Sequence, residues 1–78
     1  MKTDCYIVYD KNGLVVGVTS TLSDADLLKF LDAKVYLKEH GHSYLDYTRD
    51  EDVEYYADHC YTINKENFYT KPFRTEEL

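Results

Sequence analysis

Residues 5–19 read C-Y-I-V-Y-D-K-N-G-L-V-V-G-V-T, two β-branched and aromatic runs joined by a short polar segment. Such runs favour β-strands. The dipeptide Asn12-Gly13 between them supplies the positive backbone φ positions that a tight hairpin turn requires. The pattern therefore predicts an N-terminal β-hairpin with strands over about residues 5–10 and 14–19.

The two predicted strands are apolar at most positions, so we expect both faces of the hairpin to be at least partly covered. Gly17 lies inside the second strand. A glycine there indicates a β-bulge or a close approach by another element.

A long helix is predicted over about residues 24–40. Ser23 and Asp26 resemble a short capping box, and Gly41 follows the helix as its C′ residue. Apolar residues recur at helical spacing and mark the side expected to pack on the sheet, with Leu31 at its centre. They are Leu27, Leu28, Phe30, Leu31, Val35 and Tyr36.

Acids and tyrosines alternate over residues 44–61, which read Y-L-D-Y-T-R-D-E-D-V-E-Y-Y-A-D-H-C-Y. Residues 42–47, at the start of this region, are expected to form a loop or a short strand. Thr48 and Glu51 match a capping box. Apolar residues then follow at i, i+3, i+4 and i+7, which predicts a short acidic helix over about residues 49–60. They are Val53, Tyr56, Ala57 and Cys60.

The C-terminal part can supply one or two further strands, from residues 61–63 and 68–70. Pro72 interrupts regular structure, and residues 71–78 are expected to form a frayed tail. The whole sequence of 78 residues predicts a single small α+β domain. In it the hairpin and the later strands form a small, mostly antiparallel sheet. The long helix covers one face, and the short acidic helix packs at an edge or on the same face.

The charge balance narrows the classes of partner. Nine Lys and Arg stand against fifteen Asp and Glu, a net charge of −6. That sign disfavours direct contact with nucleic-acid phosphates or anionic lipid and favours a basic protein surface. No apolar run approaches the roughly 20 residues that span a bilayer, and the N-terminus lacks the apolar stretch of a signal peptide. We therefore expect a cytoplasmic protein, in the host cytoplasm if a phage encodes it.

Residue types that bind metals occur without the spacing of a metal site. Cys5, Cys60, His40, His42 and His59 lack the paired spacing of zinc ligands, so we expect no metal, no cofactor and reduced thiols. His59 and Cys60 do not form a nucleophile pair, because neighbours in a helix point about 100° apart. No catalytic or nucleotide-binding motif is present, and an enzyme remains the third alternative.

The predicted acidic helix carries acids and one tyrosine on the side away from its apolar stripe. Asp50, Glu54 and Asp58 form a row that rises about 6 Å per step and resembles a line of phosphates in spacing and sign. Tyr55 lies among these carboxylates, as an aromatic interface anchor would. The simpler reading is a solvated face that keeps the protein soluble. The candidate partner-binding residues are Asp46, Tyr47, Asp50, Glu51, Asp52, Glu54, Tyr55 and Asp58.

These features favour a non-enzymatic acidic protein-binding module. In size and charge the chain resembles the small inhibitors that phages and mobile elements encode against host defence nucleases, anti-CRISPR proteins and DNA mimics among them. The resemblance implies that it occupies a basic, nucleic-acid-binding surface of a partner enzyme. The alternative is a structural or assembly subunit that forms a homodimer through the hairpin edge.

Overall fold

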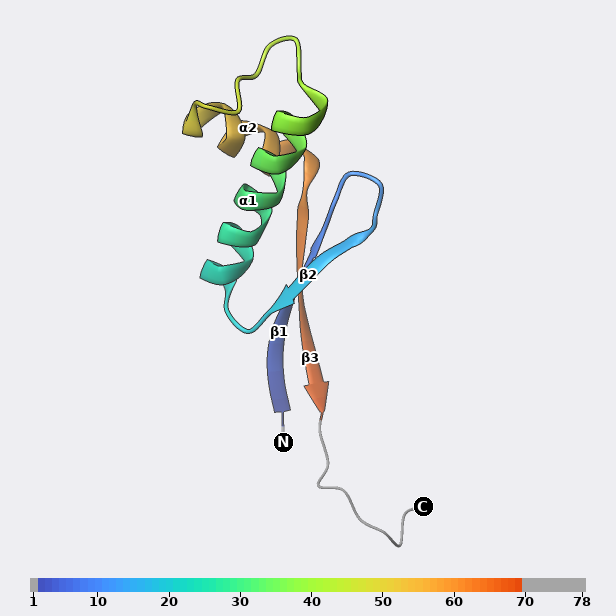
Figure 1. Ribbon diagram of the computed structural model, residues 1–78. Helices are drawn as coiled ribbons and strands as arrows, with labels where there is room; N and C mark the ends of the chain where they lie inside the picture. Colours follow the sequence, from blue (N-terminus) through green and yellow to red (C-terminus); the bar gives the residue numbers. More distant parts are fainter. Residues whose placement is uncertain (1, 70–78) are drawn as a thin grey trace, which may run out of the picture.

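The computed structural model describes residues 2–69, which form a small α+β domain of three strands and two helices (Figure 1). In chain order these are β1 (Lys2–Tyr9), β2 (Val15–Thr19), α1 (Leu22–His40), α2 (Asp50–Cys60) and β3 (Thr62–Tyr69). The strands form one antiparallel sheet in the order β2-β1-β3, as the predicted fold class requires. A single strand, β3, follows the helices. Residue 70 and the predicted tail over 71–78 lie outside the described residues.

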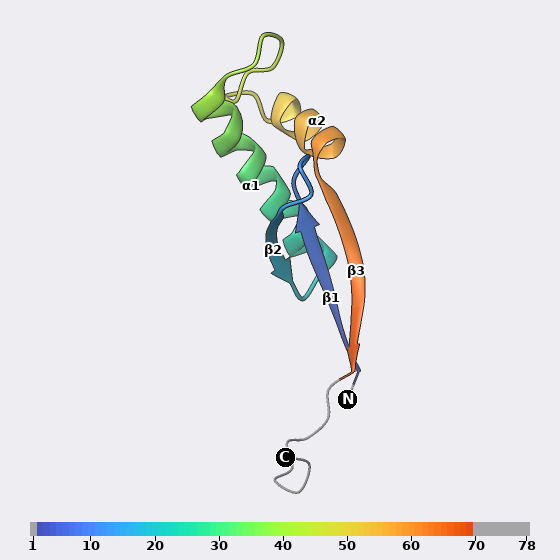
Figure 2. The ribbon, with the colours of Figure 1, turned by 90° about the vertical axis from the view of Figure 1, so that its right-hand side faces the viewer.

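The helices pack on one side of the sheet (Figures 1 and 2). α1 lies along the sheet, and α2 packs beside α1 near the point where β3 begins. The far ends of β1 and β3 extend beyond the helices as a two-stranded ribbon, in which Lys2 pairs with Tyr69. The N-terminal end of β1 and the C-terminal end of β3 therefore lie together, at the end of the molecule opposite α2.

The predicted hairpin is confirmed, but its turn is longer than the predicted one. The Asp10 carboxylate accepts hydrogen bonds from the backbone N–H groups of Asn12 and Leu14, at 2.8 and 3.0 Å. Gly13 has a φ of 80°, whereas Asn12 does not have a positive φ. The prediction of positive φ at both positions is wrong for Asn12, because the Asp10 side chain organises the loop in place of a two-residue turn.

Gly17 shows both features that its position in the strand indicates. The pairing of β1 with β2 shifts between Val8, opposite Gly17, and Tyr9, opposite Val15, which is a β-bulge. A Cβ atom on Gly17 would lie 2.6 Å from Leu28 Cδ2. α1 therefore lies so close to β2 at this point that only glycine fits without a shift.

The expectation that both faces of the hairpin are at least partly covered is met along β1, where Cys5 is buried and Ile7 and Tyr9 are half-buried, but is wrong for β2. Side chains alternate between the faces of a strand, so Val8 and Gly17 face the helices while Val18 faces away. Val15 and Val18 are 58% and 59% exposed. The second face of the hairpin is therefore open to solvent at β2.

α1 begins earlier than predicted and ends where predicted. Its N-cap is Thr21, whose hydroxyl accepts a hydrogen bond from the Asp24 N–H at 3.1 Å. The predicted capping box of Ser23 and Asp26 is wrong, because Thr21 has the extended backbone that an N-cap requires and Ser23 already lies inside the helix. Gly41 ends the helix with a φ of 73°.

The buried side of α1 differs from the predicted side. Ala25, Ala33 and Leu37 are its buried residues. Leu28, Phe30 and Tyr36 pack partly against the core, as predicted. The remaining three predicted residues are about half exposed, so their place in the core, and Leu31 at its centre, are wrong: Leu27, Leu31 and Val35. α1 is apolar around most of its circumference, and the alanines allow a closer approach than a leucine stripe does.

The core joins β1, α1 and α2. Val8 of β1 is fully buried within it. The burial of Val53, Tyr56 and Ala57 confirms the apolar stripe predicted for α2. The rings of Tyr36 and Tyr56 stack with centroids 5.6 Å apart, and Tyr61 meets Tyr56 edge-on. These contacts hold α2 on α1 and fix which side of α2 faces outward.

The start of α2 also differs from the prediction. Its N-cap is Arg49, which makes no side-chain capping hydrogen bond. The predicted capping box of Thr48 and Glu51 is wrong, because the Thr48 hydroxyl donates to Asp46 Oδ1 at 2.7 Å instead. Residues 42–47, left open between loop and strand, form a loop.

Cys5 is buried and Cys60 is half-buried, and both are free thiols. Within residues 2–69, neither helix combines the length and the apolar composition that crossing a bilayer requires.

Candidate functional site

α2 presents an exposed, acidic outer face. Its inner side, with Val53 and Ala57 buried, packs against α1, so the carboxylates project away from the core. Five of the eight candidate residues lie exposed on this helix, and we call them the acidic face. They are Asp50, Glu51, Glu54, Tyr55 and Asp58.

Tyr55 is held in a fixed position on the acidic face. Its side chain is 56% exposed, and its ring stacks on that of His59, with centroids 4.0 Å apart and an interplanar angle of 26°. Nδ1 of His59 lies 2.8 Å from the backbone oxygen of Tyr55. A side chain that is already ordered loses less conformational entropy when a partner covers it.

A hollow of about 310 Å³ lies beside Tyr55. Tyr44, which is 88% exposed, stands on its border. Aromatic faces of this kind attract ammonium and guanidinium groups. The candidate set from the sequence omits Tyr44 and His42, although Tyr44 opens the segment in which tyrosines and acids alternate. The hollow is lined by His42, Tyr44, Leu45, Tyr55, Tyr56, His59 and Cys60.

The charges of the acidic face are not equivalent. Arg49 pairs with Glu51, and Lys29 of α1 pairs with Asp58 at 2.7 Å. Asp50 and Glu54 form no ion pair with any basic side chain of residues 2–69. The row of three acids therefore carries its uncompensated charge at Asp50 and Glu54. The sequence could not show this, since Lys29 lies 29 residues from Asp58.

The other three candidate residues are engaged within the chain. Asp46 accepts hydrogen bonds from the hydroxyl and the backbone N–H of Thr48, and these bonds hold the pKa of the Asp46 carboxyl below its ordinary value. Asp52 Oδ2 accepts the Asp46 N–H at 2.9 Å. Tyr47 is half-buried against the core. These residues shape the loop before α2 and position its first turn.

Among the described residues, no group of three or more His, Cys, Asp or Glu side chains gathers where it could hold a metal ion. The chain matches no protein-family model, no curated protein and no solved structure.

Proposed function

We propose that this chain is a non-enzymatic binding module whose acidic face docks on a basic surface of a partner protein. The partner class that fits best is an enzyme that handles nucleic acid, because its phosphate-binding surface is basic by necessity. The module would act in the cytoplasm as an inhibitor that competes with the nucleic acid, in the manner of phage anti-defence proteins and DNA mimics.

The observation that carries the proposal is the exposure of Tyr55 among carboxylates. Tyrosine is enriched at the centres of interfaces, where charged residues commonly form the surround. Glu51 and Glu54 lie next to it on α2, and the stacking on His59 fixes its ring. A face built only for solubility has no need of a large, ordered aromatic at its centre.

Affinity capture tests the proposal. The tagged protein is incubated with cell lysate, and captured proteins are identified and then purified. Binding to a captured partner should weaken as salt rises, because the contact depends on opposite charges. DNA or RNA should compete for the partner. Tyr55→Ala should weaken binding by about 2 kcal/mol or more, as expected of an interface anchor.

Charge reversal requires a matched control. The double variant Glu51→Lys/Glu54→Lys changes the net charge by +4 and should abolish binding. Glu39→Lys/Glu66→Lys makes the same change at exposed positions on α1 and β3 and should leave binding nearly unchanged. Equal loss of binding in both variants would show that the acidic face acts only through the net charge of the protein. No loss in the first variant would refute the proposal.

A second candidate function is supported by the exposed edge of the sheet. β2 is an edge strand, and its Val15 and Val18 are more than half exposed. Strands of this kind pair with a second copy in many homodimers. An assembly subunit of this type would sediment as a dimer, and Val18→Lys would convert it to a monomer. A monomer at all accessible concentrations would exclude this candidate.

A further inference from the structure

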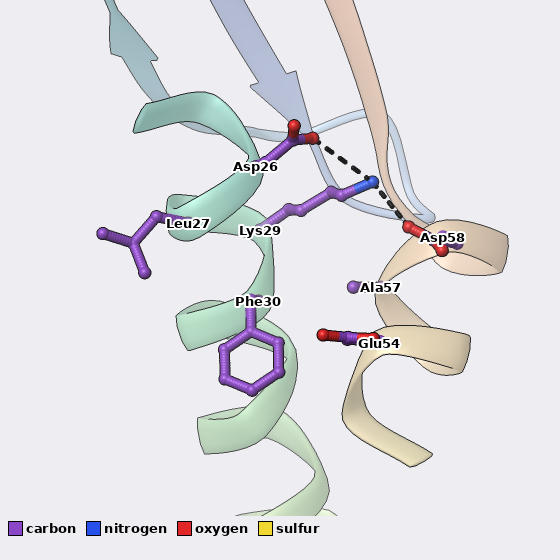
Figure 3. Close-up of a pocket in the computed structure, with 7 residues that line it drawn as sticks. All are labelled: Asp26, Leu27, Lys29, Phe30, Glu54, Ala57 and Asp58. Atoms are coloured by element: carbon purple, nitrogen blue, oxygen red, sulfur yellow. Dashed lines mark hydrogen bonds and ion pairs between the residues drawn. The ribbon is translucent and has the colours of Figure 1, made fainter. Parts of the chain in front are cut away.

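A groove lies between α1 and α2 and shares no lining residue with the aromatic hollow (Figure 3). Its volume is about 470 Å³. Leu27, Phe30 and Ala57 supply its apolar surface. Asp26 of α1 and Glu54 and Asp58 of α2 supply carboxylates along its borders. The groove thus combines an apolar surface with acidic borders on both helices.

The carboxylates outnumber the cation inside the groove. Lys29 Nζ lies 2.7 Å from Asp58 and 3.7 Å from Asp26, so one ammonium is shared between two acids. Glu54 has no basic partner among residues 2–69. The groove therefore retains negative charge, and a segment that enters it gains from carrying lysine or arginine.

Leu27 points away from α2 in Figure 3 and connects the border of the groove with further apolar residues on the outer side of α1. Leu27, Leu31 and Val35 are spaced at i, i+4 and i+8, and they are 55%, 50% and 53% exposed. We call these three the outer stripe of α1. It lies on the opposite side of the helix from Ala25 and Ala33, which are fully buried. Its residues rise by about 6 Å per step, the spacing at which a second helix presents its own side chains.

We propose that the groove and the outer stripe bind an amphipathic helix of a basic partner, with apolar side chains in the groove and lysine or arginine beside Glu54. This inference rests on the proposed function and specifies the structure of the partner segment. A loop or a flat basic surface would satisfy the carboxylates but would leave the outer stripe exposed. A helix satisfies both, because its apolar residues recur on one side and its basic residues flank them.

The test uses two labelled synthetic peptides of leucine and lysine with identical composition. In one, leucines fall on a single helical face; in the other, the order is scrambled so that they do not. Fluorescence anisotropy should show that the amphipathic peptide binds about tenfold or more tightly than the scrambled one, the gain expected from burying one or two leucines. Leu27→Ser should remove most of this difference. Leu14→Ser is the matched control, because Leu14 is 65% exposed but lies in the hairpin loop.

Each other outcome overturns the inference in a distinct way. Equal binding of both peptides, lost in Glu51→Lys/Glu54→Lys but not in Leu27→Ser, would retain the acidic face and eliminate the groove. Failure of both peptides to bind would eliminate the groove and leave the acidic face to be judged by affinity capture. If sedimentation showed a dimer that Leu27→Ser converts to a monomer, a second copy of this chain would be the occupant instead.

Discussion

The hydroxyl of Tyr61 donates a hydrogen bond to Asp32 Oδ2 at 2.5 Å, which ties the residue after α2 to the middle of α1. Tyr61 is a buried member of the core. Tyr61→Phe keeps the ring but leaves the Asp32 carboxylate without this donor, and should lower the free energy of unfolding by about 1–3 kcal/mol. Urea denaturation measures the change. An unchanged midpoint would show that water replaces the tyrosine hydroxyl without cost.

The same tyrosine should make stability fall at alkaline pH. Burial, and then the hydrogen bond to Asp32, raise the pKa of Tyr61 above its ordinary value of 10.0. The unfolded chain loses this proton near pH 10 while the native protein retains it, so the stability is complete below pH 10 and is lost as pH rises beyond it. Tyr61→Phe should flatten this decline by up to about 1.4 kcal/mol per pH unit. Burial also raises the pKa of Tyr56, so some decline should persist in the variant.

Gly17 and Leu28 should be energetically coupled. A Cβ atom at Gly17 would meet the far end of the Leu28 side chain, so Gly17→Ala forces that side chain to move and should cost up to about 1 kcal/mol of stability. In Gly17→Ala/Leu28→Ala the obstacle is gone, so the double variant should cost less than the sum of the single ones. Gly13→Ala is the control: its φ of 80° makes alanine strained, but nothing lies within 4 Å of the new methyl group. Its effect should simply add to that of Leu28→Ala.

Truncation of two leucines of α1 should change the stability by very different amounts. Leu37 is 2% exposed, and Leu37→Ala should cost about 2–5 kcal/mol. Leu31 is 50% exposed on the outer stripe, and Leu31→Ala should change stability by less than about 1 kcal/mol. Thermal and chemical denaturation of both variants decide the matter. A large loss for Leu31→Ala would mean that another element or a second copy covers the outer stripe.

The Asp46 carboxyl should titrate at unusually low pH. The hydroxyl and the N–H of Thr48 stabilise its charged form, and the pKa lies below the ordinary 3.8. Carbon-detected NMR titration should give a midpoint below that value. Thr48→Val removes the hydroxyl, the larger of the two causes, and should move the midpoint back upward. A midpoint that does not respond would assign the shift to other groups.

Local signals in the sequence predicted the elements of this fold well. Gly41 and the β-rich runs of the hairpin depend on backbone preferences that act within a few residues, and the structure has them where predicted. The predicted capping boxes were wrong because Thr21 caps α1 two residues before Ser23, and because the Thr48 hydroxyl donates to Asp46 instead of capping α2. Competition between neighbouring polar side chains cannot be resolved from a motif alone.

Which apolar side of α1 is buried could not be predicted from periodicity. Leu31 and Ala33 both fit a helical stripe, and the choice between them depends on how closely the sheet approaches, as it does at Gly17. The candidate site likewise has features that a single helix determines and features that depend on packing. Tyr55 and Glu54 follow from the wheel of a single helix, whereas the pairing of Lys29 with Asp58 depends on how two helices pack.

The pairing of Lys2 with Tyr69 has a practical consequence for using this domain as a tool. Residues 2–69 therefore begin and end side by side, at the opposite end of the domain from α2 (Figure 1). The domain can therefore be inserted into a surface loop of a carrier protein through two short linkers without stretching its sheet. In such an insertion, α2, the hollow beside Tyr55 and the groove between α1 and α2 would face away from the carrier. A biosensor or an immobilised affinity reagent requires this orientation.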